Sequence, residues 1–519
     1  MIPLFVVLGV ITLLVAGWPR GVTGGRWLTP GPFFTLYWAL ALLLPPLLAP
    51  GFYVSKPAVF FIVALVLCFV LGAYIAGGRR PAVRLPEHQP RQLNVRLLRQ
   101  LVAFGAMSGF AATFVLQVVN GYSLTSVFSV SQLFQSATAI SYERYSGNLV
   151  IPSSVPLLLS FTYAGALVAP FAAQGLRRRT ALLCYASPVL GATAYAVVTT
   201  ARAGMLTAFF FVLAGWIVQR IYWQGETPRL GWRAVVTGGA ACVGVLGTFI
   251  AIAFMRVGTI DSQYVAVVLN KISVYAVGYL TGFSRYFDSQ PPSFPHEWGA
   301  ASLAGIAKNI GAGSEYGQAL DDFVPLGNGG STNIFTAWRY LVEDFGLIGT
   351  PIVAVAAGAL LTLLWRRLVE RPSPLVALGC LAGYAFLAHS VTLPIFTFTN
   401  VVLAFMVAAF MLTREAPAAA PVGACAWRRL VPPSRQRSSG TSDGSPVSGR
   451  GAHRPPEVGT ATVVPVHGRQ DSSGARSHHG VAAALPSVSA LVEPRSPVSL
   501  ADERVRRTHD WPRPSPQCR

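Results

Sequence analysis

The residues best suited to bind a polar ligand lie at 327–349, GNGGSTNIFTAWRYLVEDFGLIG. Gly329 and Gly330 permit backbone shapes closed to other residues and leave amide groups accessible to an anion. A helix is expected to begin just after them, with a polar residue as its cap. The candidates for this cap are Ser331, Thr332 and Asn333. Because the N-terminus of a helix attracts anions, the segment predicts binding of phosphate or sugar groups.

Polar residues then continue at helical spacing, three or four positions apart. These residues are Asn333, Thr336, Tyr340 and Asp344. The spacing places them on one face of the expected helix, where they can line a binding site. Gly346 and Gly349 are expected to let that helix pack closely against a neighbour. The alternative is a purely structural loop that leads into a capped helix.

Three arginines lie at predicted helix ends, away from the arginine-rich loops: Arg202, Arg256 and Arg285. A guanidinium that faces lipid costs a few kcal/mol, so a compensating partner is expected. Guanidinium groups form two parallel hydrogen bonds to phosphate oxygens, and a diphosphate is therefore a natural partner. The alternative is that these side chains extend to the lipid headgroups.

A general base is predicted in the loop PPSFPHEWGA, where His296 and Glu297 are neighbours. A surface loop without function is the alternative interpretation. Asp344 is a further candidate to accept a proton. The adjacent Asp321 and Asp322 are not enough to indicate a metal site. No phosphate-binding loop is recognisable either, so we expect neither a metal nor a cofactor.

The acidic residues are confined to one part of the chain. Twelve precede residue 414, and eight of these lie between residues 261 and 344. None lies deep in an apolar run. Ion-coupled transporters generally need carboxylates or broken helices at mid-membrane, so this distribution argues against them. It predicts chemistry at one face of the membrane.

The elements that position these residues are apolar runs. Of the 519 residues, 53% are hydrophobic and only 12% are charged. Runs of about 18 or more apolar residues predict membrane-spanning helices. We expect eleven of them, near residues 2–18, 32–50, 57–77, 100–119, 153–174, 181–199, 203–219, 234–255, 341–365, 374–391 and 395–413. The predicted fold is an all-α, polytopic membrane bundle.

Arginine-rich loops alternate with arginine-poor ones. Arginines follow the first, third, fifth, seventh and ninth predicted spans. Because positively charged loops stay in the cytoplasm, we expect the N-terminus outside and the C-terminus inside a cytoplasmic (inner) membrane. The two long segments on the outer side are then residues 120–152 and 256–340.

The composition changes near residue 414, where Pro, Ser, Gly and Arg become abundant. We therefore predict a membrane domain at 1–413 and a disordered cytoplasmic tail at 414–519. The formal charge is +20, but most arginines lie in short loops or in the tail. This indicates contact with membrane lipid rather than nucleic acid. The six cysteines have no paired spacing, so no disulfide framework is expected.

The segment GNGGSTNIFTAWRYLVEDFGLIGT resembles the Asn-x-x-Thr … Asp-Phe-Gly-x-x-Gly motif of the bacterial O-antigen polymerase (Wzy-type) family, the oligosaccharide repeat-unit polymerases. The matching residues are Asn333, Thr336, Asp344, Phe345, Gly346 and Gly349. TTARAGML is similar to the arginine segment at the outer end of a mid-chain helix in that family, and the match is at Arg202. Ala201 stands where the family often has Ser.

The resemblance implies a membrane glycosyltransferase at the outer face. Such enzymes join oligosaccharide units linked to undecaprenyl diphosphate, as in O-antigen, capsule or exopolysaccharide synthesis. A hydroxyl of one unit attacks the anomeric carbon of the growing chain, and the lipid diphosphate leaves. It further implies other polysaccharide assembly proteins as partners, such as a flippase or a chain-length regulator.

The resemblance also implies roles for particular residues. Arg202, assisted by Arg256 or Arg285, would stabilise charge on the leaving diphosphate. Glu297, His296 or Asp344 would accept the proton. The residues implied to bind the substrate are Gly329, Gly330, Asn333, Thr336 and Tyr340.

Three other functions remain open at this point. A ligase-like enzyme, which transfers a finished glycan to another acceptor, shares the membrane plan and the leaving group. A flippase or other transporter for lipid-linked oligosaccharides is expected to show internal repeats and polar residues deep in its helices. A scaffold without enzymatic activity would not need the cations and acids at the outer face.

Overall fold

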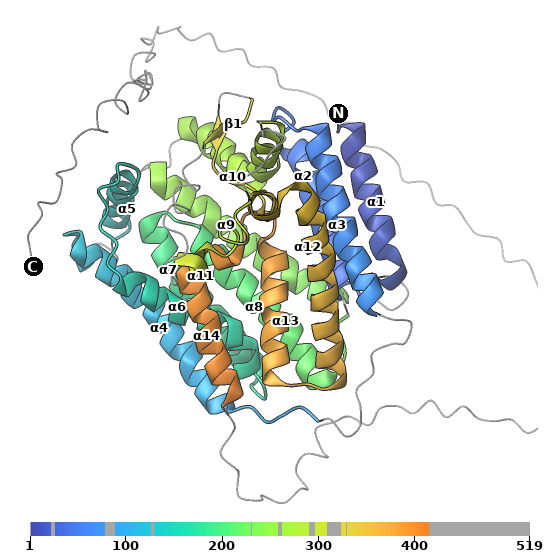
Figure 1. Cartoon of the computed structure of the whole chain (residues 1–519). Helices are drawn as coiled ribbons and strands as arrows, with labels where there is room; N and C mark the ends of the chain where they lie inside the picture. The colour runs from blue at the N-terminus through green and yellow to red at the C-terminus, as the bar shows by residue number, and fades with distance from the viewer. Residues whose placement is uncertain are drawn as a thin grey trace, which may run out of the picture. The chain divides into compact units, whose positions relative to one another are not determined.

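The computed structural model describes residues 2–21, 26–77, 89–125, 129–229, 231–257, 262–289, 296–308, 323–327 and 330–414. The described residues form helices, connecting segments and one short pair of strands (Figure 1). The helices are α1 (Leu4–Gly21), α2 (Pro30–Leu48), α3 (Lys56–Gly77), α4 (Val95–Val119), α5 (Val130–Tyr145), α6 (Ser154–Ala172), α7 (Arg178–Thr199), α8 (Ala203–Gln224), α9 (Trp232–Val257), α10 (Ser262–Ser289), α11 (Ala304–Ala307), α12 (Ala337–Glu370), α13 (Pro374–His389), η4 (Ile395–Thr397, a 3-10 helix) and α14 (Thr399–Thr413). The strands are β1 (Val324–Pro325) and β2 (Ser331–Thr332).

Eight of the described helices are long and apolar enough to cross a membrane. They are α2, α3, α4, α6, α7, α8, α12 and residues Val235–Met255 of α9. Shorter apolar stretches lie in α1, α13 and α14. The chain is therefore an all-α, multi-pass membrane protein, and each of the eleven predicted spans overlaps one of these helices. The predicted tail lies outside the described residues from 415 onward.

The helices bury two main hydrophobic cores. One is built from α4, α6, α7, α8, α13 and α14, with Phe171, Phe211 and Tyr222 fully buried in it. The other is built from α1, α2, α3, α10 and α12, with Phe34 and Trp38 at its centre. Figure 1 shows α1, α2, α3 and α12 side by side, with α4, α6 and α14 grouped apart from them.

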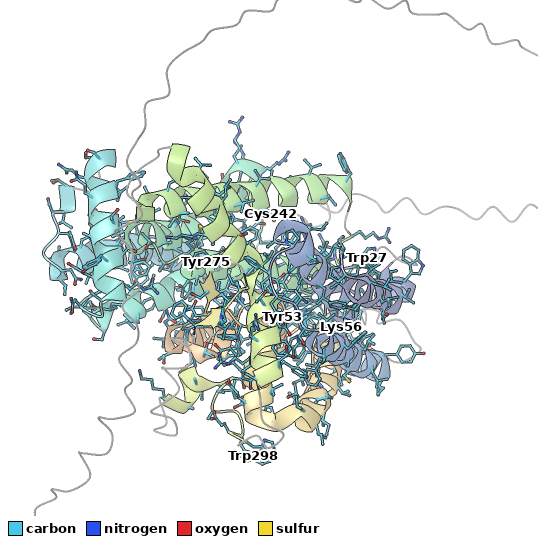
Figure 2. All side chains as sticks on the ribbon, turned by 90° about the horizontal axis from the view of Figure 1, so that it is seen from above. Trp27, Tyr53, Lys56, Cys242, Tyr275 and Trp298 are labelled. Atoms are coloured by element: carbon cyan, nitrogen blue, oxygen red, sulfur yellow. The ribbon has the colours of Figure 1, made fainter. Side chains whose placement is uncertain are left out.

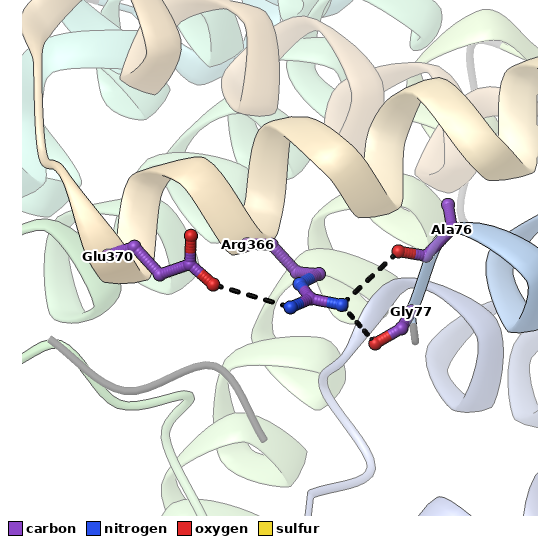
Figure 3. A network of polar contacts seen from close by, with 4 residues as sticks. All are labelled: Ala76, Gly77, Arg366 and Glu370. Carbon is purple, nitrogen blue, oxygen red and sulfur yellow. Dashed lines mark hydrogen bonds and ion pairs between the residues drawn. The ribbon is translucent and has the colours of Figure 1, made fainter. Parts of the chain in front are cut away.

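Helices α3 and α12 pack in parallel and very closely. A Cβ on Gly72 would overlap the carbonyl group of Val355, and one on Gly358 would overlap that of Phe69. Small residues at a helix interface allow this approach in a membrane, where packing replaces the hydrophobic effect as the driving force. At the far end, Arg366 donates to the carbonyl oxygens of Ala76 and Gly77, which terminate α3, and pairs with Glu370 (Figure 3).

The predicted helix start after the glycines is wrong. Helix α12 begins at Ala337, because Ser331 and Thr332 pair instead with Val324 and Pro325 in the β-pair. The Thr332 hydroxyl accepts a hydrogen bond from the Ile334 amide at 3.1 Å, a local turn that competes with helix formation.

The prediction that four polar residues share one helical face is therefore also wrong. Asn333 and Thr336 precede α12, and only Tyr340 and Asp344 lie within it.

Candidate functional site

Helix α12 is broken at Gly346, which has φ 68° and ψ −178°. Only glycine adopts this conformation readily. A Cβ here would lie 2.5 Å from Cε1 of His296, so the close packing predicted for Gly346 is against a loop rather than a helix. The hydroxyl of Thr350 spans the break by donating to the carbonyl oxygens of Leu341 and Gly346. Beyond the break, residues 347–370 are 24 residues, or about 36 Å of helix, enough to cross a membrane.

The break frees two carbonyl groups that a regular helix would use internally, those of Glu343 and Asp344. The loop after residue 295 supplies their partners. The amide of Glu297 donates to Glu343 O at 3.3 Å, and that of Trp298 donates to Asp344 O at 3.1 Å. These two hydrogen bonds fix residues 296–298 to α12 directly before the break.

Asp344 holds the same loop through its side chain. It is fully buried, and its two carboxylate oxygens accept from the amides of Ala301 and Ser302, each at 2.8 Å. These two hydrogen bonds fix the position of the carboxylate. Asp344 is thus a positioning residue for the loop that carries His296 and Glu297.

A charged cluster lies one turn before the break. Arg339, which is 6% exposed, pairs with Glu343 at 2.8 Å between Nε and Oε1. Its guanidinium group lies over the rings of Phe335 at 4.0 Å and Tyr286 at 5.0 Å. Burial, and then the charge of Glu343, raise the pKa of Tyr286 above its ordinary value, and Glu297 contributes to the same shift. Four elements therefore meet here: α10, the 296–302 loop, the segment before α12 and α12 itself.

Sequence reasoning missed Arg339, Glu343 and Tyr286 as members of the site. The Arg339–Glu343 spacing of four was visible as a helical ion pair. Tyr286 carried no such signal, because its place depends on how α10 packs on α12.

Arg202 begins α8 and is buried, with 6% exposed. The turn before it is tight: Thr200 has φ 52°, which is rare for a β-branched residue, and the Ala201 amide donates to the Thr199 hydroxyl. The guanidinium group of Arg202 lies 4.5 Å from the ring centre of Phe249 and 4.4 Å from that of Tyr275. It therefore faces protein rather than lipid.

Helix α10 connects Arg202 to the cluster around Arg339. Tyr275, Gly278, Gly282 and Tyr286 recur at steps of three and four, so they share one face of α10. The guanidinium group of Arg202 lies over the ring of the first, Tyr275, and that of Arg339 lies over the ring of the last, Tyr286. The two glycines between them allow a close approach. A Cβ added at Gly278 would contact the Thr332 side chain, and one added at Gly282 would overlap the carbonyl group of Ile334.

The segment from Thr332 to Thr336 thus lies along α10 between Arg202 and Arg339. Tyr275 and Tyr286 are eleven residues apart, about 16 Å along the helix. Figure 2 shows where Tyr275, Tyr53 and Trp298 lie when this end is seen from above.

Arg285 flanks this row. Its guanidinium group lies 3.9 Å from the ring centre of Tyr53. The Tyr53 hydroxyl donates to Asp288 at 2.7 Å, and that of Ser55 donates to the other oxygen of Asp288 at 2.6 Å. These bonds tie the segment before α3 to α10. The Nε atom of Arg285 is buried and has no hydrogen-bond partner among the described residues.

The structure brings most of the predicted residues together. Thr336 and Tyr340 are buried beside Arg339, Glu297 is half-buried, and His296 is exposed with its ring 5.8 Å from that of Trp298. The hydroxyl oxygen of Thr336 has no hydrogen-bond partner in the described part of the chain. Gly330 precedes β2, and Gly329 and the side chain of Arg256 lie outside the described residues.

No protein-family model, no curated protein and no solved structure matches this chain. The function therefore has to be argued from the geometry and from the motifs. Within the described residues, no group of three His, Cys, Asp or Glu is placed to hold a metal ion.

Proposed function

We propose that this chain is a membrane glycosyltransferase that polymerises oligosaccharide repeat units linked to undecaprenyl diphosphate. The observation that carries the proposal is the placement of residues 332–336 along α10, between the guanidinium groups of Arg202 and Arg339. A lipid-linked diphosphate has to meet cations while its sugars meet hydroxyl and amide groups. This segment resembles the polymerase motif. It supplies hydroxyl and amide groups between the two guanidinium cations.

The reaction follows from the charges. A hydroxyl of the incoming unit attacks the anomeric carbon of the growing chain, and the bond from that carbon to the diphosphate oxygen breaks. Both electrons of the broken bond leave with the lipid diphosphate, whose negative charge the arginines stabilise. The hydroxyl proton passes to Glu297. We assign it this role because Glu297 is half-buried on the loop that is hydrogen-bonded to α12 at the break.

The side of the membrane follows from the charge pattern and is supported by contacts between helix ends. Tyr222 donates to the Arg91 carbonyl at 2.8 Å, and Trp365 donates to the Thr227 hydroxyl at 3.1 Å. Each bond joins two segments that the arginine pattern puts in the cytoplasm. The candidate site lies at the opposite ends of these helices, and we propose that this end is at the outer face of the cytoplasmic membrane.

Transport of a lipid-linked glycan is the second candidate, because broken helices are common in transporters. The break in α12 favours polymerisation, however. It precedes a helical segment whose first 19 residues, 347–365, carry no charged side chain, so it lies near the membrane surface rather than at the midplane.

Purified protein in lipid nanodiscs, supplied with lipid-linked repeat units extracted from the source cells, tests the proposal. We expect a ladder of longer lipid-linked glycans. Arg202→Lys keeps the charge but not the planar group stacked on Tyr275, and this variant should form much less of the ladder. Arg367→Ala, an exposed arginine at the other end of α12, is the control. One transfer to a different acceptor would mean ligation, and passage across vesicles without new bonds would mean transport; either result would overturn the proposal.

A further inference from the structure

A pocket of about 190 Å³ opens on the other side of the turn that carries Arg202. Ala201, Ala203 and Gly204 line it, while the guanidinium group between them turns away to Phe249 and Tyr275. Its remaining wall comes from α5, α6, α7, the segment between α5 and α6, and the start of α14. Apart from Tyr163, midway along α6, the lining residues lie toward helix ends or in connections on the side proposed as the outer face.

The lining combines polar groups with rings. Polar side chains arrive from five helices, and these residues are Arg144, Tyr163, Tyr195, Thr199, Thr207 and Asn400. Phe398 adds a third ring. Thr207 is held from behind by His389, whose Nε2 lies 3.2 Å from the hydroxyl oxygen. The Tyr163 side chain is buried, and that of Asn400 is half-buried.

A lipid-linked glycan has three kinds of group, the lipid chain, the diphosphate and the sugars, and the lining residues suit only one of them. A lipid chain would leave the hydroxyl and amide groups without partners, which is costly away from water. A diphosphate needs cations, and the only one in the lining, Arg144, is exposed at the rim. A sugar ring presents hydroxyls at its edge and C–H groups on its face, which suit the hydroxyls, the amide and the aromatic rings. The volume is below the range of pockets for drug-sized ligands, so one ring fits and an oligosaccharide does not.

We propose that this pocket binds one sugar ring of the incoming repeat unit, next to the turn that carries Arg202. The acceptor role rests on the proposed polymerase function. The pocket would hold the acceptor on one side of Arg202 while the diphosphate of the donor lies along α10 on the other side. The six lining groups would then determine which sugar is accepted.

Labelling of a cysteine in the pocket tests binding without catalysis. The protein is the full-length chain with its six native cysteines replaced by alanine and with Asn400→Cys. The probe is the repeat-unit glycan released by mild acid from the extracted lipid. Its presence at ten times its Kd should slow labelling by a water-soluble maleimide about ten-fold, by mass action. A second cysteine-free chain that carries Lys56→Cys, an exposed position at the start of α3, should label at the same rate with and without glycan.

The results separate this inference from the proposed function. Equal labelling of Asn400→Cys with and without glycan, or protection by inorganic pyrophosphate instead, overturns the sugar pocket. Ala203→Leu, which places a larger side chain in the pocket from an exposed position, should raise the KM for the acceptor. If the unaltered protein forms a ladder and Ala203→Leu forms it with the same KM, the pocket assignment fails and polymerisation stands. If no ladder forms but glycan still protects Asn400→Cys, polymerisation fails and a glycan pocket stands.

Discussion

Arg339 and Glu343 form an ion pair of 2.8 Å one helical turn apart, directly before α12 breaks at Gly346. The pair lies under the ring of Tyr286 and beside the loop that Asp344 holds. Because of this ion pair, the guanidinium group of Arg339 is held in a fixed position, and the carboxylate of Glu343 is occupied. The carboxylate that we propose as the proton acceptor is that of Glu297, on the loop attached to the break.

Removal of Arg339 should separate its contribution to folding from its contribution to the reaction. Arg339→Ala leaves Glu343 largely buried without its cation, which costs about 3 kcal/mol and lowers the unfolding temperature. The double variant Arg339→Met, Glu343→Leu removes both charges and should recover most of that stability. We expect it to remain inactive, since the cation beside the diphosphate is gone. Thermal unfolding and the product ladder are the two measurements, and a double variant that polymerises at the normal rate would remove Arg339 from the mechanism.

Glu297→Gln tests the general base. General-base catalysis contributes about 10²- to 10⁴-fold, so the rate of polymerisation should fall by that order while the unfolding temperature stays unchanged. The acid limb of the rate against pH, which reports protonation of the base, should disappear with it. Glu226→Gln, an exposed acid beyond α8, is the matched control. Retention of the wild-type pH profile in Glu297→Gln would exclude this residue as the base.

Eight of the eleven predicted membrane spans are confirmed as helices of sufficient length, because apolar length alone predicts them. The Arg339–Glu343 pair was likewise within reach, since it depends only on a spacing of four. The cap predicted at residues 331–333 was wrong because that segment pairs with Val324 and Pro325, a contact that is not local. The break at Gly346 and the stacking of Arg202 on Tyr275 also depend on elements distant in the sequence. Local patterns therefore selected the candidate residues, and only the tertiary structure shows how they are arranged.

Gly346→Ala should disrupt the site without touching any charged group. A side chain at φ 68° costs about 1–3 kcal/mol, and the new Cβ would also collide with His296. We expect the 296–302 loop to shift, which displaces Glu297, so that polymerisation falls more than stability does. Limited proteolysis of this loop and the product ladder measure the two effects. Gly238→Ala on α9, where an added Cβ meets nothing within 4 Å, should change neither.

Tyr286 predicts a specific dependence of stability on pH. Its pKa is raised, first by burial and then by Glu343, so the folded protein keeps the phenolic proton at a pH where the unfolded chain releases it. Stability from this group is therefore complete below pH 10, the ordinary pKa of tyrosine, and is lost as the pH rises above about 10. Tyr286→Phe removes the titrating group and should flatten this loss.

The test is a comparison of unfolding temperatures between pH 8 and pH 11 for the wild type and for Tyr286→Phe. The difference between the two curves isolates this residue from the other tyrosines. At pH 8 the variant should be at least as stable as the wild type, because the Tyr286 hydroxyl is buried without a hydrogen-bond partner among the described residues. Parallel curves would show that the pKa of Tyr286 is not raised, so that Tyr286 is not buried beside the Arg339–Glu343 pair, and the assembled cluster would have to be revised.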